Sequence, residues 1–326
     1  MKTLLLTGGT GFVGSHIVEG VLKGTDWNIT IIDRLDISGS LERLRDMDIW
    51  ESQKHRVKFI WWDLKSPINQ ITSNQIGEVD YIWHLAASSH VQRSIEDPLS
   101  FVMDNVVGTC NLLNYARTVK DLQLFIYFST DEVFGPAPEG VSYKEWDRYK
   151  SGNPYAASKA GGEELAIAFE NTYKLPVIVT HTMNIFGEKQ HPEKLIPIII
   201  KKLLNGEKLT IHGDKEGNSG RRFWIHARNV CNALLFLTDN NFISGEKYNI
   251  VGEIELSNLN IADIIAKQMD KKLDYEISIL DRPGHDFRYA LDGTKLKSLG
   301  FEYPKNFEQS ITKTVNWYLK HQNWLK

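Results

Sequence analysis

Two short segments of the sequence carry residue types suited to proton transfer. Tyr155 and Lys159 form a YxxxK spacing, which on a helix places the ammonium one turn from the phenol on the same face. Because a nearby ammonium favours the phenolate, Tyr155 could act as a base near neutral pH. A surface Tyr-Lys pair is the alternative, since this spacing is common by chance.

The second segment, Ser129-Thr130-Asp131-Glu132, ends an apolar, strand-like run over 124–129. Catalytic groups in open α/β sheets lie at the carboxyl ends of strands, so we expect this segment and the YxxxK pair to face one cleft. Two adjacent acids also commonly begin a helix or turn. The catalytic interpretation therefore requires a reaction with two carboxyl roles.

A glycine-rich turn near the amino terminus is typical of dinucleotide binding. Gly8, Gly11 and Gly14 lie between a predicted strand and a predicted helix, where backbone N–H groups can approach a pyrophosphate. Asp33 ends the next strand, where a carboxylate can accept both ribose hydroxyls and repel a 2′-phosphate. This pattern favours NAD over NADP, although Arg34 beside it could in principle favour a phosphate.

Apolar runs alternate with helical patterns through the first half of the chain. Strands are predicted over 3–7, 28–32, 57–61, 81–85, 124–129 and 177–182, and helices over 14–23, 99–119 and 155–173. This alternation predicts an α/β fold, a Rossmann-type doubly wound parallel sheet covered on both faces. We place an NAD-binding domain with the catalytic residues at 1–184 and a smaller, closely packed α/β substrate-binding region at 185–326.

The composition excludes several classes of protein. The 326 residues carry 38 Lys+Arg and 41 Asp+Glu, a formal charge of -3, and 42% hydrophobic residues, as in ordinary globular proteins. With so little net charge, we expect no electrostatic attraction to nucleic acid or to an anionic membrane.

The cysteine and histidine residues do not indicate a metal site. Cys110 and Cys231 are predicted to be buried packing residues, and no carboxylate cluster accompanies His191 or His212, so we expect no metal site. Without a long apolar segment, a soluble, cytoplasmic protein is expected.

The sequence resembles the extended short-chain dehydrogenase/reductases and, within them, the NDP-glucose 4,6-dehydratases. The similarity runs nearly from end to end. It rests on the segments TGGTGFVGSH, DRLDISGSLERL, HLAASSHVQRSIEDPLSFVMDNVVGT, FSTDEVFG, NPYAASKAGGE, HPEKLIP, DRPGHDFRYALD and KTVNWYL. The TDE and RPGHD strings discriminate within the superfamily, because the glycine turn and YxxxK occur throughout it.

This resemblance implies a redox-neutral elimination in three steps. Phenolate Tyr155, with Lys159 and Thr130, would take the sugar 4-hydroxyl proton while the C4 hydride passes to NAD. Glu132 would remove the acidified C5 proton, and protonated Asp131 would donate to the departing 6-hydroxyl, so that water leaves. Return of the hydride to C6 would give an NDP-4-keto-6-deoxy sugar and regenerate NAD.

Beyond the catalytic residues, the resemblance implies two binding sets. The predicted cofactor-binding residues are Gly8, Gly11, Phe12, Val13, Gly14, Asp33, Asp63, Leu64, Leu85, Ala86, Ala87, Tyr155 and Lys159. The predicted substrate-binding residues are Ser88, His90, Asn184, Glu193, Lys194, Leu195, Arg222, Asn249, Arg282 and His285. Without the resemblance, Asp63 is either a loop acid or an adenine contact. The helices over 99–119 and 155–173 match those that form a four-helix dimer interface in the family, so a homodimer is expected.

Several departures from the family pattern leave alternatives open. The segment GRRFWIH at 220–226 stands where dTDP-glucose enzymes usually carry Arg-Asp-Trp, so the base is either thymidine or uridine. Phe134 stands where Tyr is common, and the segment 139–151 with Trp146 is unlike the usual proline-rich one.

Three rival functions stay open. The first is an NDP-sugar 4-epimerase, which needs neither Asp131 nor Glu132 for elimination. The others are a non-catalytic NAD- or nucleotide-sugar-binding protein and an amino-sugar 5,6-dehydratase.

Overall fold

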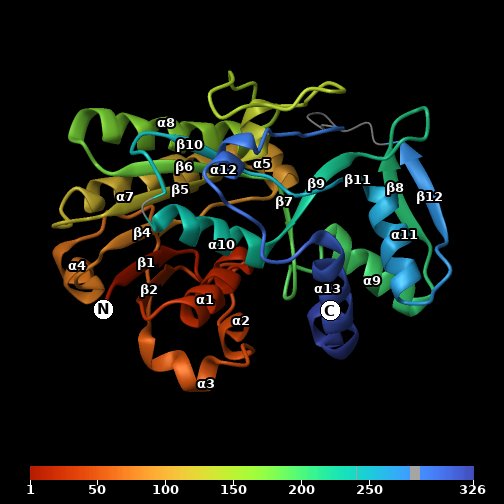
Figure 1. Ribbon diagram of the computed structural model, residues 1–326, viewed down its shortest axis with the longest axis horizontal. Coiled ribbons are helices and arrows are strands. Elements are labelled where there is room, and N and C mark those ends of the chain that lie inside the picture. Colours follow the sequence, from red (N-terminus) through yellow and green to blue (C-terminus); the bar gives the residue numbers. More distant parts are fainter. Residues whose placement is uncertain (240, 280–286) are drawn as a thin grey trace.

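A parallel sheet of seven strands forms the centre of the molecule. The computed structural model describes residues 1–239, 241–279 and 287–326. The strand order across the sheet is β10-β6-β5-β4-β1-β2-β3 (Figure 1). Its strands are β1 (Thr3–Thr7), β2 (Asn28–Asp33), β3 (Val57–Trp61), β4 (Tyr81–His84), β5 (Leu124–Thr130), β6 (Val177–Thr182) and β10 (Lys247–Ile250). The predicted Rossmann-type fold is confirmed, and the six predicted strands are found within one residue at each end.

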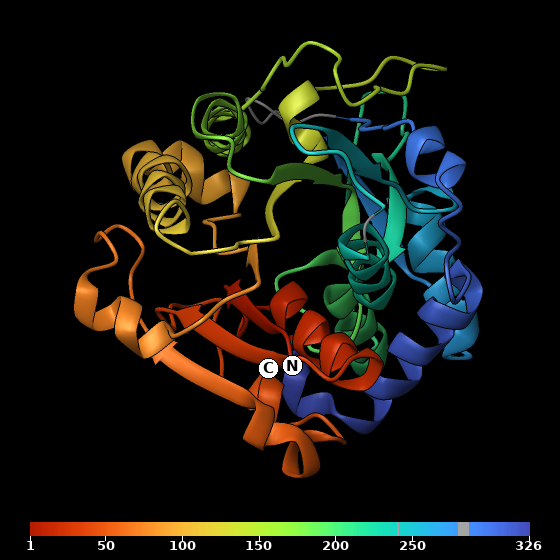
Figure 2. The same ribbon diagram turned by 60° about the vertical axis from the view of Figure 1, so that its left-hand side comes forward.

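Helices cover both faces of this sheet. The elements associated with it are α1 (Phe12–Gly24), α2 (Glu42–Arg45), α3 (Trp50–Gln53), η1 (Lys54–Arg56), α4 (Gln70–Ile76), α5 (Val91–Glu96), α6 (Pro98–Val102), η2 (Met103–Val107), α7 (Gly108–Ala116), η3 (Asp131–Phe134), α8 (Pro154–Tyr173), α10 (Ala227–Thr238) and α12 (Thr294–Ser298). In Figure 2, the yellow-to-green helices α7 and α8 lie together on the other side of the sheet from the red α1 and the teal α10.

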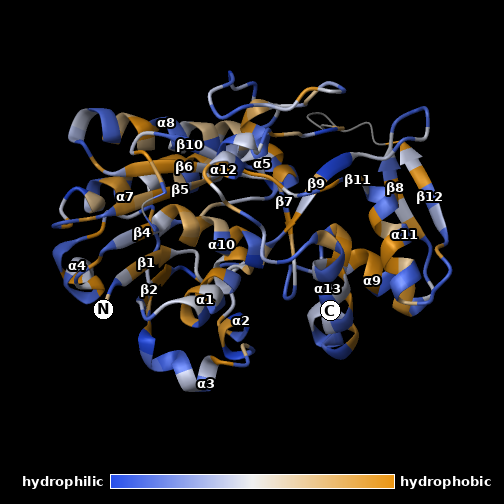
Figure 3. Ribbon diagram, viewed as in Figure 1, coloured by the Kyte–Doolittle hydropathy of each residue, from blue (hydrophilic) through white to orange (hydrophobic). Residues whose placement is uncertain are grey.

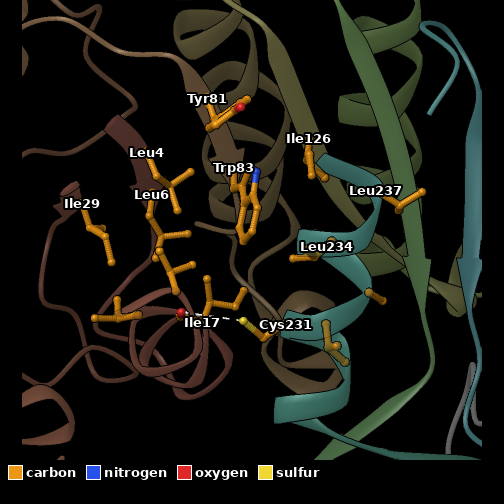
Figure 4. Packing of buried hydrophobic residues seen from close by; sticks show 14 of the residues in the cluster. Leu4, Leu6, Ile17, Ile29, Tyr81, Trp83, Ile126, Cys231, Leu234 and Leu237 are labelled. Carbon is orange, nitrogen blue, oxygen red and sulfur yellow. Dashed lines mark hydrogen bonds between the residues drawn. The ribbon is translucent and has the colours of Figure 1, made fainter. Parts of the chain in front are cut away.

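Alternation of side chains along the strands produces two separate cores. Leu4 and Leu6 pack with Ile17 of α1 and Leu234 of α10, whereas Leu5 packs in the cluster on the opposite face. Figure 4 shows the first cluster, in which Cys231 donates a weak hydrogen bond to the Ile17 carbonyl. Figure 3 shows where hydrophobic residues lie along the chain: the central strands are largely orange, and α3 at the periphery is mostly blue. Both faces are therefore sealed, as a parallel sheet requires.

The smaller region has its own core beyond the carboxyl edge of the sheet. It contains β7 (Asn184–Phe186), β8 (Leu209–Gly213), β9 (Arg221–His226), β11 (Glu255–Ser257), β12 (Tyr275–Ile279), α9 (Leu195–Asn205), α11 (Asn258–Gln268), α13 (Phe307–Lys320) and η4 (Gln322–Leu325). Tyr318 of α13 is fully buried in this core, and the Trp324 ring nitrogen donates to Asp46. The terminal aromatic residues thus pack within the chain.

Three features differ from the sequence-based expectations. The strand β10, within the predicted substrate-binding region, joins the central sheet beside β6, so the second half of the chain contributes to both parts. The predicted helix over 99–119 is interrupted by the π-helical turn η2 and ends at Ala116. Cys231 is buried as predicted, but Cys110 is only partly buried.

The helix α8 begins where its sequence directs. The Asn153 side chain accepts a hydrogen bond from the Ala156 N–H and caps the helix, and Pro154 occupies the first helical position. Both residue types are favoured at these positions, because a cap acceptor satisfies a free N–H and proline has none to satisfy. The cap fixes Tyr155 in the first turn of α8, next to the carboxyl end of β5.

Candidate active site

A cavity of about 400 Å³ lies at the carboxyl ends of the strands β1 to β6. Its wall contains every predicted cofactor-binding and catalytic residue. From the predicted substrate set it contains Ser88, Asn184 and Lys194. The structure therefore brings the glycine turn, the TDE segment and the YxxxK pair to one site, as expected for ligands of open α/β sheets.

The glycine turn tolerates no side chain at two of its positions. Gly8 has a left-handed φ of 73°, and a Cβ there would lie 2.8 Å from the Ala86 nitrogen. A Cβ at Gly14 would overlap the Gly8 carbonyl oxygen. The turn thus packs β1 tightly against α1 and leaves its backbone open to the cavity, an arrangement that fits a pyrophosphate at the N-terminus of a helix.

Asp33 is held in a fixed orientation at the end of β2. One carboxylate oxygen accepts from the Thr10 hydroxyl at 2.6 Å and the Thr10 N–H at 3.1 Å, and the other accepts from the Leu35 N–H at 3.0 Å. A carboxylate oxygen has room for further donors, so this side chain can still accept ribose hydroxyls. The geometry fits the predicted contact with the adenosine ribose of NAD.

Arg34 is engaged by three carboxylates and does not form a phosphate site. Its guanidinium donates to both oxygens of Asp104, at 2.6 and 2.8 Å, and to Asp36 at 3.0 Å. It also lies 3.6 Å from an Asp63 oxygen. Asp104 and Asp36 raise the pKa of Arg34, led by the hydrogen bond to Asp104. The surrounding negative charge would repel a 2′-phosphate, so Arg34 does not offset the preference for NAD set by Asp33.

Tyr155 and Lys159 lie buried on one face of α8, facing the end of β5. The Lys159 ammonium donates to the Phe128 carbonyl at 2.6 Å, and burial lowers the pKa of Lys159 to about 7. Burial also raises the pKa of Tyr155, as does the charge of Glu132, while a hydrogen bond with Thr130 opposes the rise. The protein groups alone favour the neutral phenol, contrary to our expectation of a phenolate from Lys159. A cationic nicotinamide in the cavity would favour the phenolate.

Asp131 and Glu132 occupy different environments although they are adjacent. Burial, and after it the charge of Glu132, raises the pKa of Asp131 to about 7. The Asp131 Oδ2 atom has no hydrogen-bond partner among the described residues, while Oδ1 accepts from the Thr130 hydroxyl at 3.0 Å. Glu132 instead accepts from the Asn153 amide at 3.1 Å. One carboxyl is thus suited to hold a proton near neutral pH, and its neighbour accepts a hydrogen bond from a side-chain amide.

This environment predicts that Asp131→Asn stabilises the fold at alkaline pH. The folded pKa of about 7 exceeds the ordinary 3.8, so the folded protein holds a proton that the unfolded chain has lost. Stability from this group is present below pH 3.8 and is lost as the pH rises to about 7. As the pH is raised from 4 to 8, the Tm of the variant should rise by a few degrees relative to the Tm of wild type. The exposed Asp26→Asn should show no such trend, and a constant difference for Asp131→Asn would contradict the buried acid.

Among the described residues of the predicted substrate set, His90, Glu193, Leu195, Arg222 and Asn249 lie outside the cavity wall. His90 caps α5, and its ring lies 3.7 Å from a Glu193 oxygen, which also contacts Arg93. Leu195 begins α9. Arg222 of β9 stacks on the Tyr289 ring at 4.7 Å, and its charge lowers the pKa of Asp131. Arg282 and His285 lie outside the described residues.

Asn249 is placed differently from the rest of the predicted substrate set. It is fully buried on β10, where its amide nitrogen donates to the carbonyls of Tyr143 and Asp292 and its oxygen pairs with the His181 ring. A direct substrate contact would have to replace one of these bonds.

Asp104 and Asn105 are among the residues at the site that sequence reasoning missed. Asp104 lies in the π-helical turn η2, lines the cavity, and accepts from the Ser88 hydroxyl at 2.6 Å. Asn105 beside it exchanges two hydrogen bonds with the Ser88 backbone. The π turn aims both side chains at the predicted substrate segment, and such turns occur often at functional sites. A lone acid within an apolar helical pattern was the only available signal.

Among residues 1–239, 241–279 and 287–326, no three His, Cys, Asp or Glu side chains are grouped so that they could hold a metal ion. Within the part of the chain that the structure describes, no helix has the length and apolar character needed to cross a bilayer.

The glycine turn, the strand-end acid and the YxxxK helix, set on a seven-stranded parallel sheet, define an extended short-chain dehydrogenase/reductase. Residues 5–314 match the family model described as GDP-mannose 4,6 dehydratase. A dTDP-glucose 4,6-dehydratase of Streptomyces niveus is 37% identical over 98% of this chain and 94% of the relative. The low-salt glycan biosynthesis protein Agl12 of Haloferax volcanii is 38% identical over 97% and 98%. The chain belongs to this family of nucleotide-sugar 4,6-dehydratases.

Solved structures agree with this assignment. A dTDP-glucose 4,6-dehydratase of Streptomyces venezuelae, solved with NAD bound, superposes with a TM-score of 0.89 at 34% identity and covers 99% of each chain. A UDP-N-acetylglucosamine 4-epimerase of Methanobrevibacter ruminantium reaches a TM-score of 0.86 at 26% identity, covering 98% and 99%. Because dehydratases and epimerases share the fold, the reaction must be argued from the site.

Proposed function

We propose that the chain converts an NDP-glucose to the NDP-4-keto-6-deoxyglucose with NAD as its cofactor. The observation that carries this proposal is the pair Asp131 and Glu132, which lies at the end of β5 in the same cavity as Tyr155. The two carboxyls have different environments, as an elimination with one acid and one base requires. A 4-epimerase has no step that uses such a pair.

NAD, when bound, would supply a hydride acceptor for the sugar C4 and a hydride donor for C6. The glycine turn would hold its pyrophosphate and Asp33 its adenosine ribose. Tyr155 would accept the proton of the sugar 4-hydroxyl, with Thr130 as its hydrogen-bond partner. Lys159 would add positive charge beside the phenol and help to stabilise its ionised form.

The elimination would use the two carboxyls in opposite roles. Glu132, held by the Asn153 amide, would remove the C5 proton made acidic by the C4 ketone. Asp131 would donate its proton to the departing 6-hydroxyl, because its raised pKa keeps that proton available at neutral pH. Water leaves, and the double bond between C5 and C6 can then receive a proton and the returned hydride.

The nucleotide is proposed to be a pyrimidine nucleoside diphosphate, with dTDP-glucose favoured and UDP-glucose as the alternative. Relatives that are 34–37% identical carry the name dTDP-glucose 4,6-dehydratase, which supports thymidine. The segment Arg221-Arg222-Phe223-Trp224 on β9 is the reason that uridine remains in the test.

One experiment tests the reaction and the base together. The purified protein is incubated with dTDP-, UDP-, CDP- and GDP-glucose, and 4-keto product is followed by its absorbance in alkali and by mass. We expect one of the pyrimidine nucleotides to yield product lighter by one water, with no net NADH. Turnover of no substrate, or product of unchanged mass, would count against the proposed reaction.

A homodimer formed through the helices near α6, α7 and α8 also belongs to the proposal. Leu99 and Val102 of α6 are 68% and 42% exposed, and Ile95 of α5 is 38% exposed, so large apolar side chains face solvent at the predicted interface. Contact with a second copy of the chain would remove these side chains from water. The cytoplasmic location stays a prediction from the sequence.

The Leu99→Glu variant is expected to dissociate this dimer. A charge placed in an apolar interface loses its hydration without gaining a partner, which should weaken association about tenfold or more, equivalent to ~1.4 kcal/mol. Light scattering after gel filtration over a range of concentrations measures the change. Ile279→Glu on β12, which is 60% exposed and lies in the smaller region, serves as the control. Equal dimerisation of both variants would place the interface elsewhere.

A further inference from the structure

A buried charged cluster lies behind the catalytic residues and takes no part in the proposed reaction. It consists of Glu163 on α8, His181 on β6 and Lys247 on β10, with side chains that are 0%, 0% and 4% exposed. The Lys247 ammonium and the His181 Nε2 atom each lie 3.0 Å from Glu163 Oε1. The Nδ1 atom of His181 pairs with the Asn249 side-chain oxygen at 3.0 Å. The cluster therefore joins three elements around one carboxylate.

Glu163 continues the face of α8 that carries the catalytic pair. It lies four residues after Lys159 and eight after Tyr155, so the three side chains stand one above another on the helix. Lys159 donates to the Phe128 carbonyl at 2.6 Å, and the Ser129 hydroxyl donates to Glu163 Oε2 at 2.9 Å. Consecutive turns of α8 are thus fixed to consecutive residues of β5, directly before Thr130.

Lys247 connects the cluster to the segment 139–151, whose sequence departs from the family pattern. Its ammonium donates to the Tyr149 hydroxyl at 2.5 Å and lies 4.3 Å from the centre of the Trp146 ring. The same stretch of chain leads to Asn153, which caps α8 and donates to Glu132. The cluster therefore contacts the end of β5 at Ser129 and the segment that leads into α8 at Trp146 and Tyr149.

The charged character of this cluster needs an explanation other than stability. A buried ion pair is generally no more stabilising than well-packed apolar side chains of similar volume, because both charges lose their hydration. It does restrict geometry, since hydrogen-bonded charges tolerate few alternative arrangements. This restriction matters most where small displacements change a reaction rate.

We propose that Glu163, with Lys247 and His181, is a positioning residue that fixes α8 against β5 and so sets Tyr155 and Glu132 in their reactive orientations. This inference rests on the proposed function for the identity of the reaction. It assigns to Glu163 an effect on the rate of chemistry, exerted through the backbone of α8 and β5 and not through contact with the substrate.

The test compares Glu163→Gln with Glu164→Gln in the full-length protein loaded with NAD. The two residues are neighbours on α8, but the Glu164 side chain is 66% exposed. Its Oε1 atom lies 3.9 Å from the Lys247 ammonium, farther than the 3.0 Å of Glu163 Oε1. We expect Glu163→Gln to lower kcat by roughly 10–10²-fold with little change in KM, the scale for misplaced reacting groups. The isotope effect with C4-deuterated substrate should rise as C4 oxidation becomes limiting. Glu164→Gln should match wild type.

A double variant separates positioning from loss of folding. Glu163→Gln alone leaves Lys247 buried without its counter-ion, so it is expected to lower Tm, whereas Glu163→Gln with Lys247→Met removes both charges and should recover most of the Tm. If Glu163 positions the site, kcat stays low in the double variant. Recovery of both Tm and kcat, or a wild-type kcat for Glu163→Gln, would overturn the proposal.

Failure of the proposed function would look different. If the wild-type protein interconverted C4 epimers and released no dehydrated product, the dehydratase assignment would fail. The same variants would still test the cluster, because both reactions share oxidation at C4 and the rate of that step is measured directly.

Discussion

The Tyr155→Phe variant is expected to lose C4 oxidation by about 10²–10⁴-fold, the usual scale for removing a general base, while it still binds NAD and substrate. The side chain is only 9% exposed and packs edge-on against Phe101, so a phenyl ring fits the same space. The variant loses only the hydroxyl that pairs with Thr130 and faces the cavity. Rapid mixing with substrate, followed at the reduced-nicotinamide absorbance band, measures the step.

The control for this variant is Tyr173→Phe. Tyr173 lies at the end of the same helix, is 47% exposed, and stacks with Arg117 far from the cavity wall. The same deletion of one hydroxyl should leave turnover unchanged there. Wild-type oxidation by Tyr155→Phe would remove the tyrosine from the mechanism, whereas equal losses in both variants would indicate a general effect on folding.

The sequence predicted those parts of the fold and site that depend on local pattern. The strands from β1 to β6 are short apolar runs, and the glycine turn between β1 and α1 is constrained by sterics that the residue types themselves reveal. The strand-end acids Asp33, Asp131 and Glu132 were likewise predicted at the positions where they are found. These features need few partners from distant parts of the chain.

The features that were missed depend on distant partners. The strand β10 begins with Lys247, a residue that suits a buried strand only because Glu163 neutralises it. The ion pair between Arg34 and Asp104 could not be predicted either, because the two residues are 70 positions apart in the sequence. The effect of burial on the pKa of Tyr155 is of the same kind, because it depends on packing from several elements. Periodicity carries no information on such pairings.

The adjacent carboxyls give the result that separates elimination from epimerisation. Asp131→Asn keeps the shape of the side chain but cannot donate the proton that makes the 6-hydroxyl a good leaving group. Glu132→Gln keeps the hydrogen-bonding position opposite Asn153 but cannot accept the C5 proton. Both variants retain Tyr155, so oxidation at C4 should proceed.

Each variant should therefore accumulate reduced cofactor on the enzyme when substrate is added, and release 4-keto-6-deoxy product roughly 10²-fold or more slowly than wild type. The absorbance of reduced nicotinamide reports the first effect, and product mass reports the second. An epimerase would respond otherwise, because neither carboxyl has a role once the C4 ketone has formed. If both variants interconverted C4 epimers of the NDP-hexose at the wild-type rate, and the wild-type product kept the mass of its substrate, the carboxyl pair would have no part in catalysis and the dehydratase mechanism would have to be abandoned.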